Sequence, residues 1–335
     1  MTLPTEYRVV RGAPDSKPVI GLAKSKAKLE PNDVAMKITH SGLCSTDLHF
    51  MDKDIVLGHE GVGVVQDVGS AVTKFKPGDR VGFGFVKDGC GECEACQKGL
   101  HFHCKVAPRR FGVGDENQGS FGEFAIWPDT NLHKIPDELS SEEAAPLLCA
   151  GITVFQPLQE FDMKQGNRVG IIGIGGLGHL AIQFAAKRGA EVVVFSSSED
   201  KREEAECFGA SEFYVTKDLA NKKPEKGLDM LIITSTSHPD WPTFLGMLNP
   251  RGHVCFFEFT SEDLHMPYLT VAFSELNLHG GLARTPKEIQ DTLEFAAKHG
   301  VKTAIETFPM TEEGTARALE KLKSGKMRYR GVFEI

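Results

Sequence analysis

The chain has 335 residues, of which 41% are hydrophobic and 25% charged. This composition is that of a globular protein and excludes a disordered or collagen-like chain. At roughly 150 residues per domain, the length predicts two domains. The net charge of −8 opposes binding to a polyphosphate backbone, so nucleic acid is not an expected partner. The longest apolar stretch, 169–186, is interrupted by five glycines, and the N-terminus lacks a signal-peptide pattern. We therefore expect a soluble cytoplasmic protein that does not enter a membrane.

Residues 1 to about 150 alternate short strand-like runs with turn sequences. The runs lie at 34–38, 61–65 and 80–83, and turns at 31–33 and 77–79 precede two of them. This part of the chain is predicted to be rich in β-strands.

From about residue 150 the pattern changes to apolar runs separated mostly by helix-like segments. The runs lie at 169–172, 191–195, 213–215, 230–233, 254–257 and 276–278. Such alternation predicts βαβ units and a doubly wound parallel sheet, hence the α/β class. The tail from 286 contains two helical patterns, 288–299 and 312–324, and ends in a strand-like segment, 329–335.

Four of the eight cysteines lie within fifteen positions, with the spacing of metal ligands. They are Cys90, Cys93, Cys96 and Cys104. Four thiolates on one loop form a closed zinc site that holds the loop and leaves no position for substrate. In the usual iron–sulfur spacing, three residues separate the last two cysteines and a proline follows, whereas seven residues separate Cys96 from Cys104 here. Disulfides are less expected, because the sequence has no secretion signal. Four unrelated buried thiols are the remaining alternative.

A second group of possible metal ligands is Cys44, His59 and Cys149. Two cysteines and one histidine with an open fourth position are a catalytic zinc arrangement. However, 89 residues separate His59 from Cys149, so the sequence pattern alone does not group them.

A glycine-rich segment follows the strand-like run 168–172 and precedes a helical pattern at 179–187. In this context glycines allow backbone amides to approach a pyrophosphate at the start of a helix. A purely structural turn is the alternative. The predicted cofactor contacts are Gly173, Gly175, Gly176, Leu177 and Gly178.

Six segments occur in the order found in one enzyme family. They are GLCSTDLH, GHE, the four-cysteine loop, PLLCAGITVF, GIGGLG and GKMRYRGV. Together they resemble the zinc-dependent medium-chain alcohol dehydrogenases, and within these the cinnamyl alcohol dehydrogenase type. The similarity covers nearly the whole chain.

The resemblance implies a β-rich, GroES-like catalytic domain formed by 1–149 and 287–335, and a Rossmann cofactor domain at 150–286. It also implies an active site in the cleft between the two domains and a homodimer formed through the Rossmann domain.

For the metal sites, the resemblance implies that Cys44, His59 and Cys149 bind the catalytic zinc, with Glu60 as an occasional fourth ligand. Asp47 would orient the His59 imidazole, as partners of ligating histidines commonly do. With the four-cysteine loop, the chain would hold two zinc ions.

For proton transfer, the resemblance implies that Thr46 hydrogen-bonds the substrate oxygen and that His49 continues a relay toward solvent. The alternatives are that Thr46 and Asp47 only cap a helix and that His49 is a surface histidine.

The end of the run at 191–195 bears on the choice between NAD and NADP. NAD sites place an acidic residue there, whereas this sequence has serines, with the acids displaced to the next helix start. Two hydroxyls and a cation suit a 2′-phosphate, and the run resembles the NADP-binding stretch of the cinnamyl type. We predict NADP(H), with contacts from Ser196, Ser197 and Lys201.

The sequence departs from the family pattern between Cys44 and His59, where only 14 residues intervene. A shorter segment here would widen the substrate pocket. Candidate pocket residues are Phe50, Phe111 and Trp127, for which core packing is the alternative. The two remaining cysteines, Cys207 and Cys255, are expected to be buried small hydrophobic residues.

The leading hypothesis is a zinc-dependent oxidoreductase that transfers a hydride between NADP(H) and a primary alcohol or aldehyde, one that is aromatic, allylic or otherwise bulky. A biosynthetic NADPH-dependent reductase of a conjugated C=C or C=N bond is a second hypothesis. A non-catalytic NADPH-binding sensor or structural protein is the third.

Overall fold

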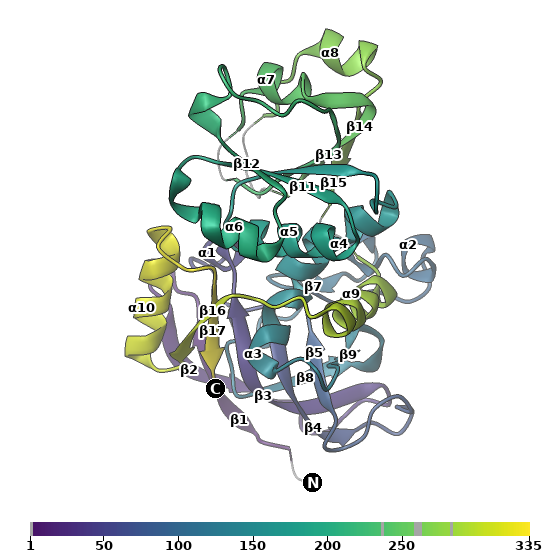
Figure 1. Cartoon of the computed structure of the whole chain (residues 1–335). Coiled ribbons are helices and arrows are strands. Elements are labelled where there is room, and N and C mark those ends of the chain that lie inside the picture. Colours follow the sequence, from purple (N-terminus) through teal and green to yellow (C-terminus); the bar gives the residue numbers. More distant parts are fainter. Residues whose placement is uncertain (1–2, 236–237, 258–262, 282–283) are drawn as a thin grey trace. The chain divides into compact units, whose positions relative to one another are not determined.

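The computed structural model describes residues 3–235, 238–257, 263–281 and 284–335. The chain forms two compact units, called unit 1 and unit 2 below (Figure 1). Unit 1 contains Met1–Ile152 and Ala283–Ile335, and unit 2 contains Thr153–Leu282. Segments from both ends of the chain therefore share unit 1.

The main sheet of unit 1 has the strand order β16-β17-β3-β4-β5-β9, with β8 also paired to β3. Its strands are β3 (Asp33–Leu43), β4 (Gly61–Val68), β5 (Arg80–Phe83), β8 (Phe124–Pro128), β9 (His133–Lys134), β16 (Ile305–Pro309) and β17 (Arg330–Glu334). Two smaller sheets are formed by β1 (Glu6–Arg11) with β2 (Val19–Lys24), and by β6 (Val86–Asp88) with β7 (Arg109–Arg110). The C-terminal strand β17 runs antiparallel to β3, which brings the tail beside the end of β3.

Short helices connect these strands, and two longer ones come from the tail. The helices of unit 1 are α1 (Ser45–Leu48), α2 (Glu94–Gln97), η1 (His101–His103), η2 (Asp129–Asn131), α3 (Ser141–Ala144), η3 (Ala145–Leu148), α9 (Pro286–His299) and α10 (Glu312–Lys323). Helix α9 begins at a capping box in which Thr285 and Glu288 satisfy each other's backbone amides. It ends at Gly300, whose φ of +66° glycine adopts without steric cost. The helices and final strand predicted for the tail are confirmed.

Unit 2 contains a parallel sheet with the strand order β12-β11-β10-β13-β14-β15. Its strands are β10 (Arg168–Ile172), β11 (Glu191–Ser196), β12 (Glu212–Val215), β13 (Leu228–Ile233), β14 (Leu248–Phe256) and β15 (Asn277–Gly280). In chain order this is 3-2-1-4-5-6, the order of doubly wound dinucleotide-binding sheets. The predicted α/β class, a GroES-like β-rich part with a Rossmann part, is confirmed.

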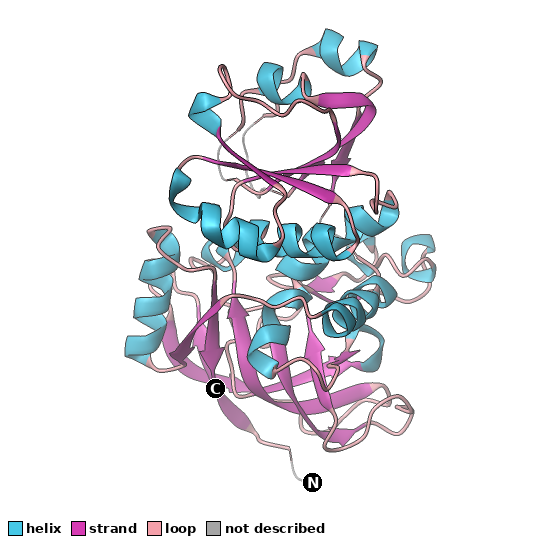
Figure 2. Cartoon of the chain, viewed as in Figure 1, coloured by secondary structure: helices cyan, strands magenta, loops and turns pink. Residues whose placement is uncertain are grey.

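Helices cover both faces of the unit 2 sheet, and the helices of this unit are short. Figures 1 and 2 show α5 (Gly178–Lys187) and α6 (Arg202–Phe208) along one face, and α7 (Trp241–Leu245) and α8 (Tyr268–Phe273) on the other. Helix α4 (Ala150–Glu160) enters from unit 1, and η4 (Glu199–Lys201) and η5 (Thr216–Asp218) follow β11 and β12. Because both faces are covered, the strands are near-continuous apolar runs, and Val193, Phe195 and Leu231 are fully buried.

The eight cysteines are all described, and every one of them is a free thiol. Cys255 is buried on β14, as predicted. The prediction for Cys207 is wrong, since it is exposed: Ala205 is the residue that α6 buries, and Cys207 lies away from it. Within the described ranges, no helix has the length and apolarity needed to cross a bilayer.

Candidate active site and metal centres

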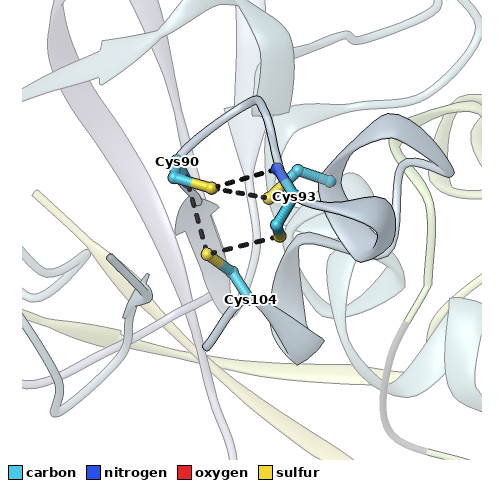
Figure 3. Close-up of side chains that lie close together, drawn as sticks. Cys90, Cys93 and Cys104 are labelled. Atoms are coloured by element: carbon cyan, nitrogen blue, oxygen red, sulfur yellow. Dashed lines mark hydrogen bonds between the residues drawn. The ribbon is translucent and has the colours of Figure 1, made fainter. Parts of the chain in front are cut away.

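The four-cysteine loop of unit 1 brings all four sulfur atoms together, and their ligand atoms lie within 4.8 Å of one another. Figure 3 shows three of these side chains, Cys90, Cys93 and Cys104, facing a common centre. The Sγ atoms of Cys93 and Cys104 are 4.0 Å apart, as are those of Cys90 and Cys96. Gly89 is required here, because a Cβ would lie 2.6 Å from Cys96 Sγ.

These distances fit a tetrahedral zinc site. With Zn–S bonds of about 2.3 Å, tetrahedral geometry places sulfur atoms about 3.8 Å apart. Backbone amides also point at the sulfur atoms: the Cys90 amide donates to Cys104 Sγ at 3.3 Å, and the Cys93 amide donates to Cys90 Sγ at 3.4 Å. Such donors stabilise thiolates, the form in which cysteine binds a metal.

A second group of possible ligands also lies in unit 1. Cys44 follows β3 and is the N-cap of α1, and Cys149 lies between η3 and α4. His59 and Glu60 immediately precede β4. The ligand atoms of these four residues lie within 4.8 Å of one another. Cys44, His59 and Glu60 are buried, whereas Cys149 is partly accessible. The fold therefore groups the residues that the sequence pattern alone did not.

Asp47 joins two parts of this group. Its Oδ2 accepts a hydrogen bond from the Cys44 backbone amide at 2.9 Å, which caps α1. Its Oδ1 lies 2.9 Å from His59 Nδ1. The helix-capping role and the histidine-orienting role, which were alternatives for the sequence, are therefore both present. Asp47 is fully buried, so both contacts are shielded from water.

The His59 ring has one nitrogen bonded and one open. Nδ1 is held by Asp47, while Nε2 is buried and has no hydrogen-bond partner among the described residues. An unpaired buried nitrogen costs free energy unless another group binds it. A zinc ion fits this position, since two sulfurs and one imidazole are the donors of an open zinc site.

A hydrogen bond between the Cys44 and Cys149 side chains shifts the pKa values of the two thiols in opposite directions. The bond from Cys149 holds the pKa of Cys44 well below its usual value, while it raises the pKa of Cys149. One thiolate is thus stabilised even when the donor set stands alone.

Behind the donor set, Glu60 pairs with Arg330 of β17. Arg330 Nη2 donates to both carboxylate oxygens of Glu60, at 2.5 and 2.6 Å. Burial raises the pKa of Glu60 to about 7, and the positive charge of Arg330 opposes that rise. Gly42 provides the space for this pair, because a Cβ there would lie 1.9 Å from Glu60 Oε2.

The two predicted relay residues lie on α1. Thr46 Oγ1 is 3.5 Å from Cys44 Sγ, beside the donor set. His49 is the C-cap of the same helix and is exposed, three residues after Thr46. Residues three apart lie on one side of a helix, so Thr46 and His49 lie on the same side of α1.

In unit 2, the glycine-rich segment forms the turn between β10 and α5. Gly173 has a φ of +93°, and a Cβ on Gly178 would lie 2.1 Å from the Gly173 carbonyl oxygen. A Cβ on Gly175 would meet open space, so the backbone there is approachable. The N-cap of α5, Leu177, provides no side-chain cap. The start of α5 therefore fits a pyrophosphate, which its amides would bind.

A cavity of about 990 Å³ begins at this turn and lies within unit 2. Gly173, Ile174, Gly175 and Ser197 are among its lining residues. Ser196 is buried at the end of β11, where its hydroxyl interacts with the Ser198 amide.

Two charged side chains of η4, Lys201 and Glu199, have partners within unit 2. Lys201 donates to the Ile174 carbonyl at 2.7 Å, which ties η4 to the glycine turn. Glu199 forms an ion pair with Arg202, and this pairing lowers its pKa.

Two family models match the chain: the alcohol dehydrogenase GroES-like domain at residues 30–137 and the zinc-binding dehydrogenase domain at residues 176–298. A probable mannitol dehydrogenase from Stylosanthes humilis is 36% identical, with 91% of this chain and 90% of the relative covered. The NADP-dependent alcohol dehydrogenase C of Mycobacterium bovis is 35% identical, with 91% of both covered. The structure of a cinnamyl alcohol dehydrogenase from Sorghum bicolor matches with a TM-score of 0.89 and 32% identity, over 98% of this chain and 97% of that one.

The chain belongs to the zinc-dependent medium-chain alcohol dehydrogenases, of the cinnamyl alcohol dehydrogenase-like type. It is therefore an oxidoreductase that acts on small-molecule alcohols.

Aromatic side chains surround the His59 ring of this alcohol dehydrogenase. The ring centroids of Phe111 and Phe85 lie 4.9 and 5.5 Å from that of His59, and Phe50 packs on Phe111 at 4.7 Å. Of the predicted pocket residues, Phe111 thus contacts His59 directly, and Phe50 packs on Phe111. Trp127 stacks on Phe83 at 4.0 Å within the core of the sheet and also lines a small cavity together with His59 and Phe111.

The short segment between Cys44 and His59 packs into the dehydrogenase core. Met51, Ile55 and Leu57 are buried in one apolar cluster. The backbone amides of Gly12 and Ala13 donate to the carbonyls of Ile55 and Met51. The segment is thus tied to the end of β1.

Sequence reasoning missed the role of Arg330 in this dehydrogenase. The residue lies in the GKMRYRGV segment, among other basic residues, and nothing local marks it as the buried one. The available signal was its place in a strand-like segment, where an inward-pointing arginine needs a carboxylate partner.

Proposed function

We propose that the chain is a zinc-dependent, NADP(H)-linked dehydrogenase that interconverts a primary alcohol and its aldehyde, with aromatic, allylic or otherwise bulky substrates. The observation that carries this proposal is the unpaired His59 Nε2, buried beside the sulfur atoms of Cys44 and Cys149. These three residues would hold the catalytic zinc. The four-cysteine loop would hold a second, structural zinc.

The residues around this site have separate tasks. When bound, zinc would supply a Lewis acid next to the substrate oxygen, and the nicotinamide would supply or accept the hydride. The Thr46 hydroxyl would pass a proton between the substrate oxygen and His49, which reaches solvent. Asp47 would fix the tautomer and orientation of His59. Glu60, paired with Arg330, would keep a carboxylate behind the zinc.

Two features support NADP(H) over NAD(H). Ser197, a neutral residue, lines the cavity where an NAD site would place an acid. The nearby acid Glu199 is paired with Arg202. The mycobacterial relative is described as NADP-dependent, in keeping with this assignment.

The aromatic residues beside His59 support a preference for flat, apolar substrates. Phe85, Phe111 and Phe50 form an uninterrupted series of ring contacts that starts at His59. Aromatic rings favour edge-to-face and offset contacts with another ring, each worth about 0.5–1.5 kcal/mol beyond the buried area. A cinnamyl or benzylic aldehyde would gain these contacts, whereas a short aliphatic aldehyde would not.

The test is NADPH oxidation with aliphatic, benzylic, cinnamyl and terpenoid aldehydes, together with the zinc content of the protein. We expect two zinc ions per chain and the highest kcat/KM with the aromatic and bulky aldehydes. Cys149→Ser should lose one zinc and nearly all aldehyde reduction. The matched control is Cys207→Ser, which changes an exposed thiol outside both clusters and should retain both zinc ions and full activity.

Each part of the proposal fails on a different result. Full aldehyde reduction by Cys149→Ser would overturn the zinc mechanism. Equal or better turnover with NADH would overturn the NADP(H) preference. Turnover of enones without turnover of aldehydes would instead indicate a reductase of conjugated double bonds, and tight NADPH binding without any turnover would indicate a sensor.

We propose further that the protein is a homodimer formed through unit 2. Helix α8 exposes Tyr268, Leu269 and Phe273, with 79%, 65% and 84% of their surfaces accessible. Strand β15 lies at the end of the sheet order and exposes Leu278. Exposed apolar patches of this kind mark association surfaces. Phe273→Asp should convert the dimer to a monomer in light scattering, and a wild-type protein that is monomeric at micromolar concentration would refute the proposal.

A further inference from the structure

Two histidines of unit 2 lie side by side on neighbouring strands. His253 of β14 and His279 of β15 approach each other so that His253 Nδ1 is 3.0 Å from His279 Nε2. His279 pairs in register with Cys255, two residues after His253, so the two imidazoles are diagonal neighbours on one face of the sheet. Leu278, next to His279, lies on the opposite face. Among the described residues, neither histidine belongs to the ligand groups of unit 1 or lines the cofactor cavity.

A third ring, from the residue that follows α4, packs on both imidazoles. Phe161 stacks on His253 with ring centroids 4.3 Å apart and lies 4.1 Å from the ring of His279. These contacts restrict the orientation of both imidazoles before any ligand binds. Both histidines are only partly buried, so the pair is accessible from solvent.

The charges around the pair favour a cation. Burial lowers the pKa of both imidazoles, so both are neutral at pH 7, the form in which histidine binds a metal. The negative charge of Glu160, the last residue of α4, acts on both pKa values in the opposite direction. Asp229 acts on His253 in the same sense, although its oxygens accept hydrogen bonds from Asn249 and the Arg168 amide. An ion held by the two rings would therefore gain from two negative charges.

The separation of the two nitrogens suits a transition metal. With metal–nitrogen bonds of about 2.0–2.1 Å, nitrogens 3.0 Å apart subtend an angle of about 95° at the ion. This is close to the right angle between neighbouring ligands in square-planar and tetragonal complexes, the geometries of copper and nickel with nitrogen and oxygen ligands. The proton that joins the rings would move to the outer nitrogen of its own ring. Both inner nitrogens could then bind the ion, and each imidazole would stay neutral.

We propose that His253 and His279 form a binding site for a divalent transition-metal ion of the nickel and copper class, separate from both ligand groups of unit 1. Water would complete the coordination, and the charge of Glu160 would strengthen it. Because the two ligands come from β14 and β15, the bound ion would join the last two strands of the sheet and stabilise unit 2.

The test is a calorimetric titration of nickel chloride into the full-length, zinc-loaded protein. We expect one nickel ion to bind per chain, with the zinc content unchanged in native mass spectrometry. His253→Gln and His279→Gln should each weaken nickel binding about tenfold or more, because loss of a ligand exceeds the effect of losing a ligand's hydrogen-bond partner. Saturating nickel should raise the melting temperature of the wild type and raise it much less in these variants. Magnesium should not compete, since it prefers oxygen ligands.

Two further variants serve as controls. His265→Gln changes an exposed histidine of the same unit and should bind nickel like the wild type. Cys149→Ser changes the ligand group of unit 1 and should also keep its nickel affinity. A measurement on the wild type needs no substitution: paramagnetic nickel should broaden the imidazole NMR signals of His253 and His279 before that of His265.

Several results would overturn the proposal. A wild type that binds no nickel, or His253→Gln and His279→Gln proteins that bind it unchanged, would mean that the two rings only pack together. Loss of nickel binding in Cys149→Ser would place the ion in unit 1. Competition by magnesium, or an equal loss in His265→Gln, would indicate attraction to surface charge or to scattered histidines. If a variant fails to fold, broadening of the His265 signal ahead of the other two would decide against the site.

Discussion

Asp47 uses its two oxygens in two directions: one caps α1 and the other holds His59 Nδ1. Because α1 is a single turn, it has little stability of its own and depends on such contacts. The same carboxylate therefore fixes the position of Cys44 and the orientation of His59. Metal ligands gain affinity when they are held in place before the ion binds.

Asp47→Asn should weaken zinc binding at the Cys44 site about 10- to 100-fold, because the charged partner of His59 is lost. Zinc retention against a chelator, measured by mass spectrometry, checks this, with the ion of the four-cysteine loop as an internal reference. The control is Asp52→Asn, an exposed residue that contacts Lys53. Wild-type zinc affinity in Asp47→Asn would contradict the role assigned to this carboxylate.

Gly42 is the residue that allows Glu60 and Arg330 to meet. Gly42→Ala would place a methyl group 1.9 Å from the position of Glu60 Oε2 and 3.1 Å from Glu60 Cβ, so the buried Glu60–Arg330 pair would have to shift. We expect the free energy of unfolding of unit 1 to fall by about 1–3 kcal/mol, the usual cost of overpacking. Urea unfolding measures this.

The control for this substitution is Gly21→Ala on β2, where a Cβ meets no atom within 4 Å. It should change the stability by less than about 1 kcal/mol. Equal effects of the two substitutions would mean that the close approach to Glu60 is unimportant.

At the scale of elements, β9 carries a buried histidine into the sheet of unit 1. His133 pairs with Gly82 of β5, and its Nε2 has no hydrogen-bond partner among the described residues. Burial lowers the pKa of His133 to about 3, because a charged imidazole cannot be solvated there. The folded state therefore favours the neutral form of His133.

This burial predicts a loss of stability in acid. Between about pH 6.5 and pH 3 the unfolded chain binds a proton at His133 that the folded chain does not, so stability falls as the pH drops. The slope from one such group is about 1.4 kcal/mol per pH unit. Urea midpoints at pH 7, 6 and 5 for the wild type and for His133→Gln measure this contribution, and the variant should show the shallower decline. Parallel declines would contradict it.

For the whole molecule, both groups of candidate metal ligands lie in unit 1, whereas the core of unit 2 is built from the parallel sheet and its helices. The two tryptophans fall one in each unit, Trp127 in unit 1 and Trp241 in unit 2. Each can therefore report the unfolding of its own unit.

Removal of zinc by a chelator should destabilise unit 1 selectively, because metal binding contributes directly to the folding free energy of its site. In Trp241→Phe, where Trp127 reports, the fluorescence melting temperature should fall by several degrees. In Trp127→Phe, where Trp241 reports, it should change much less. Equal shifts in the two reporters would show that the units do not unfold separately.

Several features of this protein were determined by its sequence alone. The spacing of Cys90, Cys93, Cys96 and Cys104 predicts a metal loop, and the structure brings the four sulfurs together. The glycine turn and the alternating apolar runs predict the doubly wound sheet of unit 2. These features can be predicted because each depends on residues that are close together in the chain. The geometry of such residues follows from their spacing and side-chain type.

Contacts between residues far apart in the chain depend on how its strands pair and pack. Antiparallel pairing of β17 with β3 brings Arg330 to Glu60, and the packing of η3 brings Cys149 to Cys44. In unit 2, pairing of β11 with β12 places Lys217 on the cavity with Ser197, while Lys201 binds the glycine turn. Strand pairing and burial determine these contacts, and neither can be predicted from a short segment of sequence.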